Sequence, residues 1–308
     1  MDIEDFPAIT KEPPVISASY KTDIPAHYMD SFMSALEAGR IEVANPYNAK
    51  QTGVVSLSPA TLRVITWWSK DYAPWIRVYE TPRGREILSR YVNYFNFTIN
   101  GERGYELEPG LQTTLGERFA QLQWLVATFG VDAMNVRFDP IVFYHGAFAS
   151  GPDRDDLAAQ QNNLLYFEPI VAQCAALGLP TVSTAFVNHY NKTISRMRRY
   201  GHELYSLSVP QKTEIGDRLH GMASSYGVDL RWCAQQDVSE FTATGASVCT
   251  DSERIGRLLA ARGLSIPAVP RKEPNRPGCR CMSSVDVGDY KKMPCGGRCL
   301  YCYANPGH

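Results

Sequence analysis

The chain has 308 residues, of which 44% are hydrophobic and 20% are charged, an ordinary composition for a folded protein with a substantial core. Its 31 basic and 32 acidic side chains give a formal net charge of −1, which argues against a generally basic surface for nucleic acid or anionic lipid. No apolar run approaches the roughly 20 residues that cross a bilayer, and the acidic opening MDIEDFPAITKEPP is unlike a secretion signal. We therefore expect a cytoplasmic protein with no membrane partner, and nothing in its charge favours nucleic acid.

Short β-rich runs separated by amphipathic stretches dominate the first 265 residues. Apolar runs of strand length, which suit strands buried on both faces, lie at 15–19, 40–46, 62–69, 94–99, 134–140, 181–186 and 229–234. The longer stretches between them predict helices, several of which close on a glycine suited to a helix C-terminus, at 27–40, 113–130, 156–178 and 251–263.

This alternation predicts an α/β fold with parallel strands joined by right-handed crossovers. Polar or proline-containing clusters follow most of the strands, and in a barrel these ends meet at one mouth. We therefore predict a complete or partial (β/α) barrel of TIM type over residues 1–265. Residues 266–308 are rich in Pro, Gly and Cys, and we expect a bound metal to order them over the barrel mouth, within the same domain.

The most specific motif is a CxxxCxxC triplet formed by Cys295, Cys299 and Cys302. Eight cysteines in a chain without a secretion signal indicate metal or redox chemistry before disulfides. Three thiolates at this spacing can hold a 4Fe-4S cluster and leave its fourth iron open to a ligand. A zinc site is the alternative, although zinc favours four ligands from paired CxxC elements.

A second metal site is a weaker hypothesis. Four further late cysteines complete a tetrathiolate set if the fold brings them together, for a second iron-sulfur cluster or a structural zinc: Cys233, Cys249, Cys279 and Cys281. Ordinary buried cysteines are the alternative, and Cys174, alone in the helical run AQCAALG, is predicted to serve packing only.

Polar residues at the predicted strand ends are the candidates for binding and catalysis. Lys70 ends the third strand, after Trp67 and Trp68, which point to opposite faces, so that one belongs to the core. Arg137 and Asp139 lie two apart on one strand and therefore share a face, where they either form an ion pair or hold the hydroxyl and carboxylate groups of a cofactor.

The first two loops offer similar choices. Lys21 and Asp23 follow the first strand, and they either contact substrate or brace the loop, with Asp23 able to cap the following helix. Asn45 and Asn48 in NPYN suit a tight turn, with cofactor binding by Asn45 as the alternative.

Several motifs together resemble one known family. The tail CLYCYAN on the cysteine triplet, the opening ISAS followed by TDIPA, and NPYN, WWSKDYAP, RFDPI and CRCMSSVDVGDY are similar to the DUF1848 family over nearly the whole chain. The triplet of that family in turn resembles the cluster motif of radical S-adenosylmethionine enzymes. This resemblance implies a 4Fe-4S cluster on the three cysteines, S-adenosylmethionine on its open iron, and Tyr301 against the adenine.

The resemblance also implies an electron donor such as flavodoxin or ferredoxin and a small-molecule substrate. Two features depart from it. The triplet follows the predicted barrel instead of its first strand, so the order of elements would be circularly permuted. Where the resemblance leads us to expect two arginines, the first loop has Tyr20 and Lys21, and lysine lacks the bidentate fork of arginine.

Four functions remain open from the sequence. The first is reductive cleavage of S-adenosylmethionine with radical chemistry on a small molecule. The second is transfer of a 3-amino-3-carboxypropyl group to a nucleophilic acceptor. The third is a non-catalytic iron-sulfur or zinc protein. The weakest is a nucleic-acid lyase, because RMRR at 196–199 is the only dense basic cluster.

Overall fold

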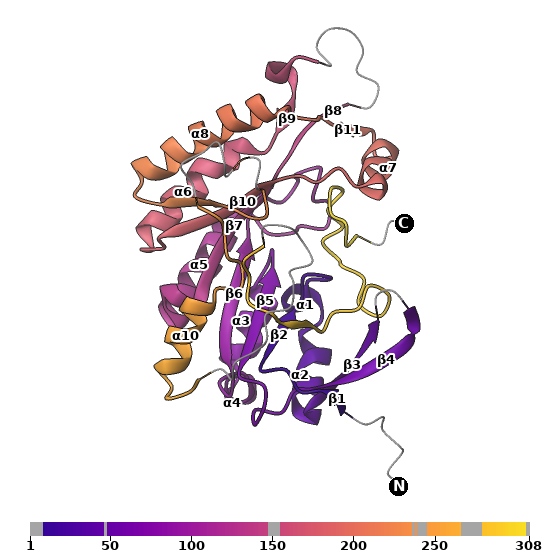
Figure 1. The fold of residues 1–308 in the computed structure, drawn as a ribbon, viewed down its shortest axis with the longest axis vertical. Coiled ribbons are helices and arrows are strands. Elements are labelled where there is room, and N and C mark those ends of the chain that lie inside the picture. The colour runs from indigo at the N-terminus through magenta and orange to yellow at the C-terminus, as the bar shows by residue number, and fades with distance from the viewer. Residues whose placement is uncertain are drawn as a thin grey trace.

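The centre of the protein is a seven-stranded sheet in which all neighbouring strands run parallel. The computed structural model describes residues 9–45, 48–146, 155–235, 238, 245–265 and 279–305. The order across the sheet is β12-β10-β7-β6-β5-β2-β13, and Figure 1 shows the strands from β10 to β2 side by side. The seven strands are β2 (Val15–Ala18), β5 (Val64–Ser69), β6 (Val92–Thr98), β7 (Met134–Ile141), β10 (Thr181–Phe186), β12 (Asp229–Trp232) and β13 (Val285–Asp286).

The sheet confirms the predicted α/β class with parallel strands. Its strands follow the chain order from β2 to β12, whereas β13, the last strand, lies beside β2. The sheet has two edges, β12 and β13, and among the described strands these do not pair with each other. Strand pairing among the described residues therefore does not close the sheet into a barrel.

One predicted strand lies elsewhere. The run at 40–46 does form a strand, β3 (Arg40–Asn45), but it pairs antiparallel with β4 (Asn48–Ser56) in a separate three-stranded sheet that also contains β1 (Ile9–Lys11). Its assignment to the barrel was wrong, because a short connection joins antiparallel neighbours, whereas a parallel partner needs a long crossover. A third small sheet, antiparallel, consists of β8 (Phe143–Gly146), β9 (Gln161–Asn162) and β11 (His202–Leu204).

The helices cover the sheet, and along the chain they alternate with its strands (Figure 1). Three of the four predicted helices begin and end close to their predicted bounds. They are α2 (Met29–Ala38), α5 (Leu115–Phe129) and α10 (Ser252–Ala260). The others are α1 (Ile24–His27), α3 (Ala73–Glu80), α4 (Pro82–Leu88), α6 (Phe167–Ala176), α7 (Asn191–Arg199) and α8 (Val209–Ser225). None of the described helices is both long and apolar enough to cross a bilayer.

The helix predicted at 156–178 is shorter than expected, since only α6 in its second half is helical over several turns. Before it lie the 3-10 turns Leu157–Ala159 and Leu164–Tyr166 and the short strand β9. The side chain of Asp156 accepts a hydrogen bond from the Ala158 N–H and that of Asn162 from the Leu164 N–H. Such local bonds compete with a continuous helix.

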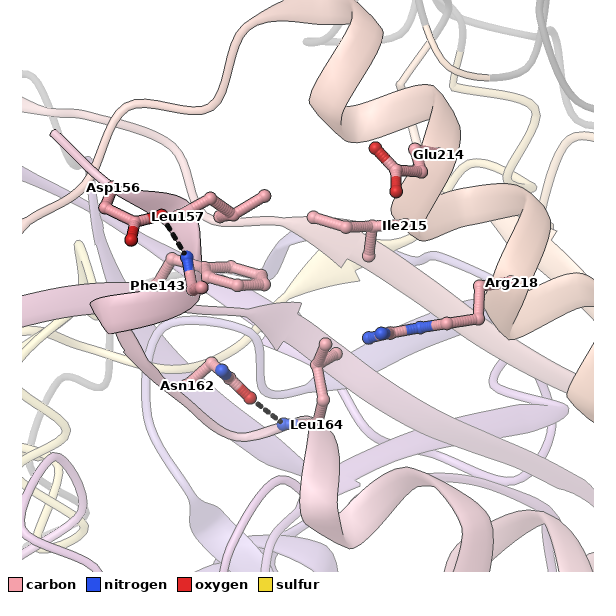
Figure 2. A pocket seen from close by; sticks show the side chains of 9 residues that line it. Phe143, Asp156, Leu157, Asn162, Leu164, Glu214, Ile215 and Arg218 are labelled. Carbon is pink, nitrogen blue, oxygen red and sulfur yellow. Dashed lines mark hydrogen bonds between the residues drawn. The ribbon is translucent and has the colours of Figure 1, made fainter.

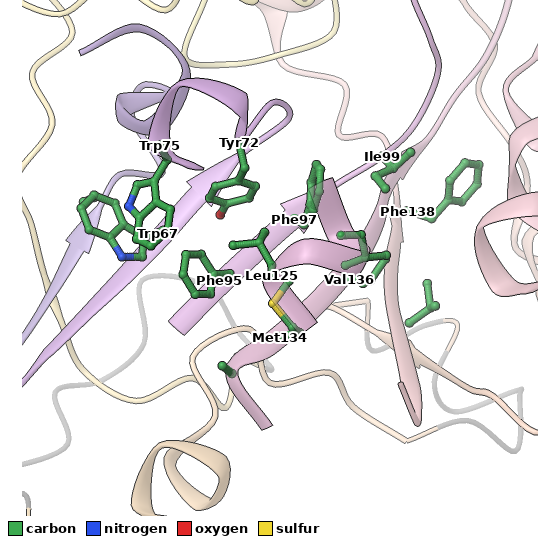
Figure 3. Close-up of a cluster of buried hydrophobic side chains, with 14 of the residues drawn as sticks. Trp67, Tyr72, Trp75, Phe95, Phe97, Ile99, Leu125, Met134, Val136 and Phe138 are labelled. Carbon is green, nitrogen blue, oxygen red and sulfur yellow. The ribbon is translucent and has the colours of Figure 1, made fainter. Parts of the chain in front are cut away.

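One face of the sheet carries the main hydrophobic core. Trp67 is fully buried there and meets Trp75 of α3 edge to face, with ring centroids 5.8 Å apart. Trp75 in turn packs against Phe95 of β6 at 4.9 Å. Figure 3 shows these rings in one layer with Phe97 and Val136. The core thus forms where the strands and the crossover helices meet, as a parallel sheet requires.

The opposite face, here called the inner face, changes from apolar to polar along the strands. At the amino ends, Val64 and Tyr94 pack against Ile255 and Leu259 of α10. Nearer the carboxyl ends, buried polar side chains replace them: Ser17, Thr66, Asn96, Asn135 and Ser183. The helix α10 therefore covers the amino-terminal end of the inner face, and polar groups lead toward the other end.

Candidate functional site

The cysteine-bearing segment lies against the carboxyl ends of the central strands. The hydroxyl of Tyr301 accepts hydrogen bonds from Lys70 Nζ at 3.1 Å and from Asn100 Nδ2 at 3.0 Å, just after β5 and β6. The hydroxyl of Tyr303 donates to the carbonyl of Tyr20, just after β2, at 2.9 Å. In Figure 1 this yellow segment passes beside α1. Residues distant in sequence thus meet at the strand ends.

A buried carboxylate lies under Tyr301. Glu108 is fully buried, and its Oε1 lies 2.7 Å from Lys70 Nζ and also accepts a hydrogen bond from the Tyr301 hydroxyl. Burial alone would raise the pKa of Glu108, but the Lys70 ammonium and the Tyr301 hydroxyl hold that pKa below its ordinary value. Its Oε2 has no hydrogen-bond partner among the described residues. Sequence reasoning missed Glu108, because it lies in an irregular loop and not at a strand end.

The three cysteines of the triplet lie on one loop and none is in a disulfide. The sulfurs of Cys295 and Cys299 lie 3.6 and 3.8 Å from the point that a Cβ on Gly297 would occupy. Burial raises the pKa of the Cys295 thiol to about 12 and that of Cys299 well above its usual range. Among the described residues, no three His, Cys, Asp or Glu side chains converge closely enough to hold one metal ion.

An arginine from α7 holds the loop in place. The guanidinium of Arg196 donates to the carbonyls of Leu300, Cys302 and Asn305 at 3.0, 2.7 and 2.7 Å. Three carbonyls on one planar cation fix the path of the chain between the last two cysteines. Arg196 belongs to the basic cluster RMRR at 196–199, and its guanidinium therefore binds backbone carbonyls of the protein itself.

The first loop is braced by Asp23. Its side chain caps α1 by accepting from the Ala26 N–H at 3.0 Å, which was one of the alternatives that the sequence left open, and it also accepts from the Lys70 N–H at 2.9 Å. Burial raises the pKa of Asp23 despite these bonds. Asp23 therefore ties the loop after β2 to the loop after β5.

Lys21 points to a carboxylate that the sequence did not single out. Its Nζ lies 3.6 Å from Asp286 of β13 and 3.3 Å from the Gly288 carbonyl. Asp286 also accepts from Ser19 Oγ and from the Tyr20 N–H at 2.9 Å. The motif SSVDVGDY thus joins the last strand to the first loop.

Arg137 and Asp139 form the ion pair that was one of the two predicted alternatives. Arg137 is also stacked over Trp68, 5.2 Å from its ring centroid, and donates to Cys249 Sγ. Tyr20 meets the same indole edge to face at 6.0 Å. Trp67 is in the core and Trp68 faces the strand ends, so the predicted division of the two tryptophans is confirmed.

The four other late cysteines also come together. Cys233 and Cys249 have their sulfurs 3.5 Å apart, and the Cys249 N–H donates to Cys281 Sγ at 3.2 Å. The interaction with Cys281 lowers the pKa of Cys279 to about 6. Cys174 is buried in α6, as predicted.

Asn45 and Asn48 belong to the small sheet and not to the central one. Asn45 is the last residue of β3 and pairs with Asn48 across the small sheet, so its backbone does not belong to the central sheet. The side chains of both residues lie outside the described part of the chain.

A surface pocket lies apart from these residues. Figure 2 shows it between the 3-10 turns near β9 and the helix α8, with Glu214 and Arg218 facing Asp156 across it. None of the predicted site residues lines it: its lining is Phe143, Asp156, Leu157, Ala158, Asn162, Leu164, Glu214, Ile215 and Arg218.

Fold and site together define a parallel α/β protein with a cysteine-rich segment at its strand ends. The chain belongs to the family described as a domain of unknown function (DUF1848), which matches residues 15–304. No curated protein sequence matches it.

Three solved structures are distantly similar. A D-hydantoinase from a Bacillus sp. AR9 is 9% identical with a TM-score of 0.31, and the match covers 83% of this chain and 45% of that one. The IOLI protein with a bound zinc atom is 8% identical with a TM-score of 0.28, covering 81% and 58%. A putative sugar phosphate isomerase/epimerase from Anabaena variabilis is 14% identical with a TM-score of 0.30, covering 58% and 59%. The chain thus matches less than two thirds of each.

Proposed function

We propose that this protein is a radical S-adenosylmethionine enzyme that acts on a small molecule. The observation that carries the proposal is the place of the cysteine triplet. Its loop follows β13 and lies, through Tyr301, on Lys70 and Asn100 at the strand ends and on Glu108 in the loop beyond β6. Active sites of parallel α/β proteins lie at this edge of the sheet.

The strand order supports the circular permutation that the resemblance requires. Because β13 lies beside β2, the sheet reads as consecutive strands once the last strand is moved to the front. The triplet then follows the first strand of the series, the position it has in the enzymes that this family resembles. The permutation therefore leaves the cluster motif in its expected place relative to the sheet.

The residues present suit a 4Fe-4S cluster. The three thiols share one loop, and a cubane binds each thiolate to a different iron, so the sulfurs need not converge as they would round a single ion. Gly296 lets this loop pass close to α1, because a Cβ on Gly296 would lie 2.7 Å from the His27 ring. When bound, the cluster and S-adenosylmethionine would supply one-electron cleavage of a carbon to sulfur bond.

The chain's own side chains would position and shield that cofactor. Lys70 holds a positive charge beside the loop and Glu108 a buried negative one, with side-chain exposures of 18% and 0%. Tyr301 presents its ring and a hydroxyl fixed by three partners. Lys21, Arg137 and Asp139 lie on the β2 and β7 sides of the same edge, and we infer that they contact the cofactor or substrate.

The polar atoms of the inner face support the proposal that the substrate is a small polar molecule. Three buried polar atoms on or beside it have no hydrogen-bond partner among the described residues: Ser17 Oγ, Asn96 Nδ2 and Trp68 Nε1. A buried polar group without a partner is costly. A ligand with hydroxyl, amine or carboxylate groups would satisfy them.

The test is anaerobic reconstitution with iron and sulfide, reduction by dithionite or by flavodoxin, and chromatography of the nucleosides formed from S-adenosylmethionine. We expect 5′-deoxyadenosine, whereas methylthioadenosine would indicate 3-amino-3-carboxypropyl transfer instead. A Cys299→Ala variant should lose both cluster absorbance and product, while Cys174→Ala should keep both. If Cys299→Ala still formed product, the proposal would fail. A cluster that neither binds nor cleaves S-adenosylmethionine would indicate a non-catalytic iron-sulfur protein.

A further inference from the structure

We propose that Cys233, Cys249, Cys279 and Cys281 bind a structural zinc ion that joins the two open edges of the central sheet. This site is separate from the cysteine triplet, and it does not depend on the function proposed above. Cys233 directly follows the edge strand β12, and Cys281 precedes the opposite edge strand β13 by four positions. One ion would therefore hold both edges.

Backbone contacts already bring these segments together. Ser247 N–H donates to the Trp232 carbonyl of β12 at 2.8 Å, and Met282 N–H donates to the Thr250 carbonyl at 2.9 Å. A bridge also pairs Trp232 with Ala246 in parallel. The segment that carries Cys249 thus lies between β12 and the approach to β13. These backbone contacts link the edge strand β12 to the residue after Cys281.

The thiols of the four cysteines form a connected group. Cys233 Sγ lies 3.5 Å from Cys249 Sγ, and the Cys281 thiol interacts with the thiols of both Cys249 and Cys279. As they lie, the sulfurs contact one another in series, and no three meet round one point. Binding an ion therefore requires the thiols to turn toward a common centre, a side-chain movement within a backbone that already places them.

The spacing of the sulfurs favours zinc over a cluster. Zinc holds thiolates at about 2.3 Å in a tetrahedron, which sets neighbouring sulfurs about 3.8 Å apart. The 3.5 Å between Cys233 and Cys249 is close to that separation. In a cubane each thiolate binds a different iron, so the sulfurs lie well beyond it. Four thiolates and no open position are typical of a structural zinc site.

A buried cation faces the group. Arg137 is buried, and its guanidinium donates to Cys249 Sγ while its other end pairs with Asp139. Four thiolates round one Zn²⁺ leave a net charge of −2, which a buried site tolerates only beside positive charge or hydrogen-bond donors. Arg137 supplies both from β7, so it would act on the zinc through Cys249 as a positioning residue.

The experiment measures zinc in a full-length chain that cannot carry the other centre. In a Cys295→Ala/Cys299→Ala/Cys302→Ala background, elemental analysis should find one zinc per chain and no iron. Adding Cys279→Ser and Cys281→Ser should remove the zinc, whereas adding Cys174→Ala should leave it. Arg137→Met should weaken zinc binding by roughly 10-fold in a chelator competition.

Two further readouts remain if the Cys279→Ser/Cys281→Ser protein does not fold. In the triple-Ala protein, alkylation followed by peptide mass spectrometry should show Cys233, Cys249, Cys279 and Cys281 protected until a chelator is added. Co²⁺ in place of Zn²⁺ should give the absorption of a tetrahedral thiolate site. The proposal is overturned if the triple-Ala chain holds no zinc or holds iron instead. It is also overturned if a cysteine other than these four is the one protected from alkylation, or if Cys233 and Cys249 form a disulfide under reducing conditions. A failure of cofactor cleavage would leave these results unaffected.

Discussion

Lys70 and Glu108 form an ion pair 2.7 Å long beneath the cysteine-bearing segment, and the Tyr301 hydroxyl contacts both partners. Lys70 directly follows the core strand β5, Glu108 lies in a loop, and Tyr301 lies between two cysteines of the triplet. These three side chains form one buried polar cluster, which therefore links the sheet to the loop that carries the cysteine triplet. Its side chains are mostly hidden from water, so their mutual contacts decide whether the loop is held in place.

Replacing Lys70 tests this link. In Lys70→Met the Glu108 carboxylate would be left buried without its counter-charge, which costs about 3–5 kcal/mol. We expect urea unfolding to show a loss of that size. The control is Arg90→Met, which removes a solvent-exposed ion pair with Glu86 and should change stability by less than about 1 kcal/mol. Equal effects of the two substitutions would contradict the role given to Lys70.

The same pair predicts how stability depends on pH. The Lys70 ammonium and Tyr301 hydroxyl outweigh burial and hold the pKa of Glu108 below its ordinary value of 4.5. A carboxyl with a lowered pKa in the folded state stabilises the protein above its unfolded pKa, and that contribution is lost as pH falls through the folded pKa. Unfolding followed from neutral pH to acid should therefore show a decline that is shallower in Glu108→Gln. An identical decline in both proteins would exclude Glu108 as its source.

Asp286 provides a third test, at the junction of β13 and the first loop. Its oxygens accept hydrogen bonds from Ser19 Oγ, the Tyr20 N–H and the Gly288 N–H, and Lys21 lies nearby. In Asp286→Asn one oxygen becomes an NH₂ group that faces donors, and we expect a loss of about 2 kcal/mol. Thermal unfolding measures it, with Asp132→Asn at the exposed pair with Arg257 as the control. A wild-type melting temperature for Asp286→Asn would show that this junction does not stabilise the fold.

Much of the fold follows from local signals in the sequence. The buried strands β5 and β6 are rich in β-branched and aromatic residues. The helix α5 begins at the capping box of Thr114 and Glu117 and is followed by Gly130 with φ 81°. Such features depend on neighbouring residues only, so a single sequence displays them. The predicted strand at 40–46 shows the limit, because a run of apolar residues does not tell to which sheet the strand belongs.

The parts that were not predicted depend on long-range contacts. The strand β13 has two residues, too few for any periodicity, and its place beside β2 follows from the contacts of Asp286. Glu108 and Asn100 acquire their roles only where Tyr301 folds back on them. The cysteine triplet could be singled out in the sequence because its spacing is itself a signal, whereas its buried neighbours carry no such signal.

Arg196 gives the sharpest test of how the cysteine loop is held. Its guanidinium donates to the carbonyls of Leu300, Cys302 and Asn305, so Arg196→Met should release the loop without changing any cysteine. We expect faster amide hydrogen exchange over residues 299–305 than in the wild type, since local opening exposes those amides. Arg198, also on α7, pairs with Glu203 of β11, and Arg198→Met should leave that exchange unchanged. If the two variants exchange alike, the loop is held by other contacts. After reconstitution, Arg196→Met should also retain less iron per chain than Arg198→Met, because a mobile loop places its thiolates less well.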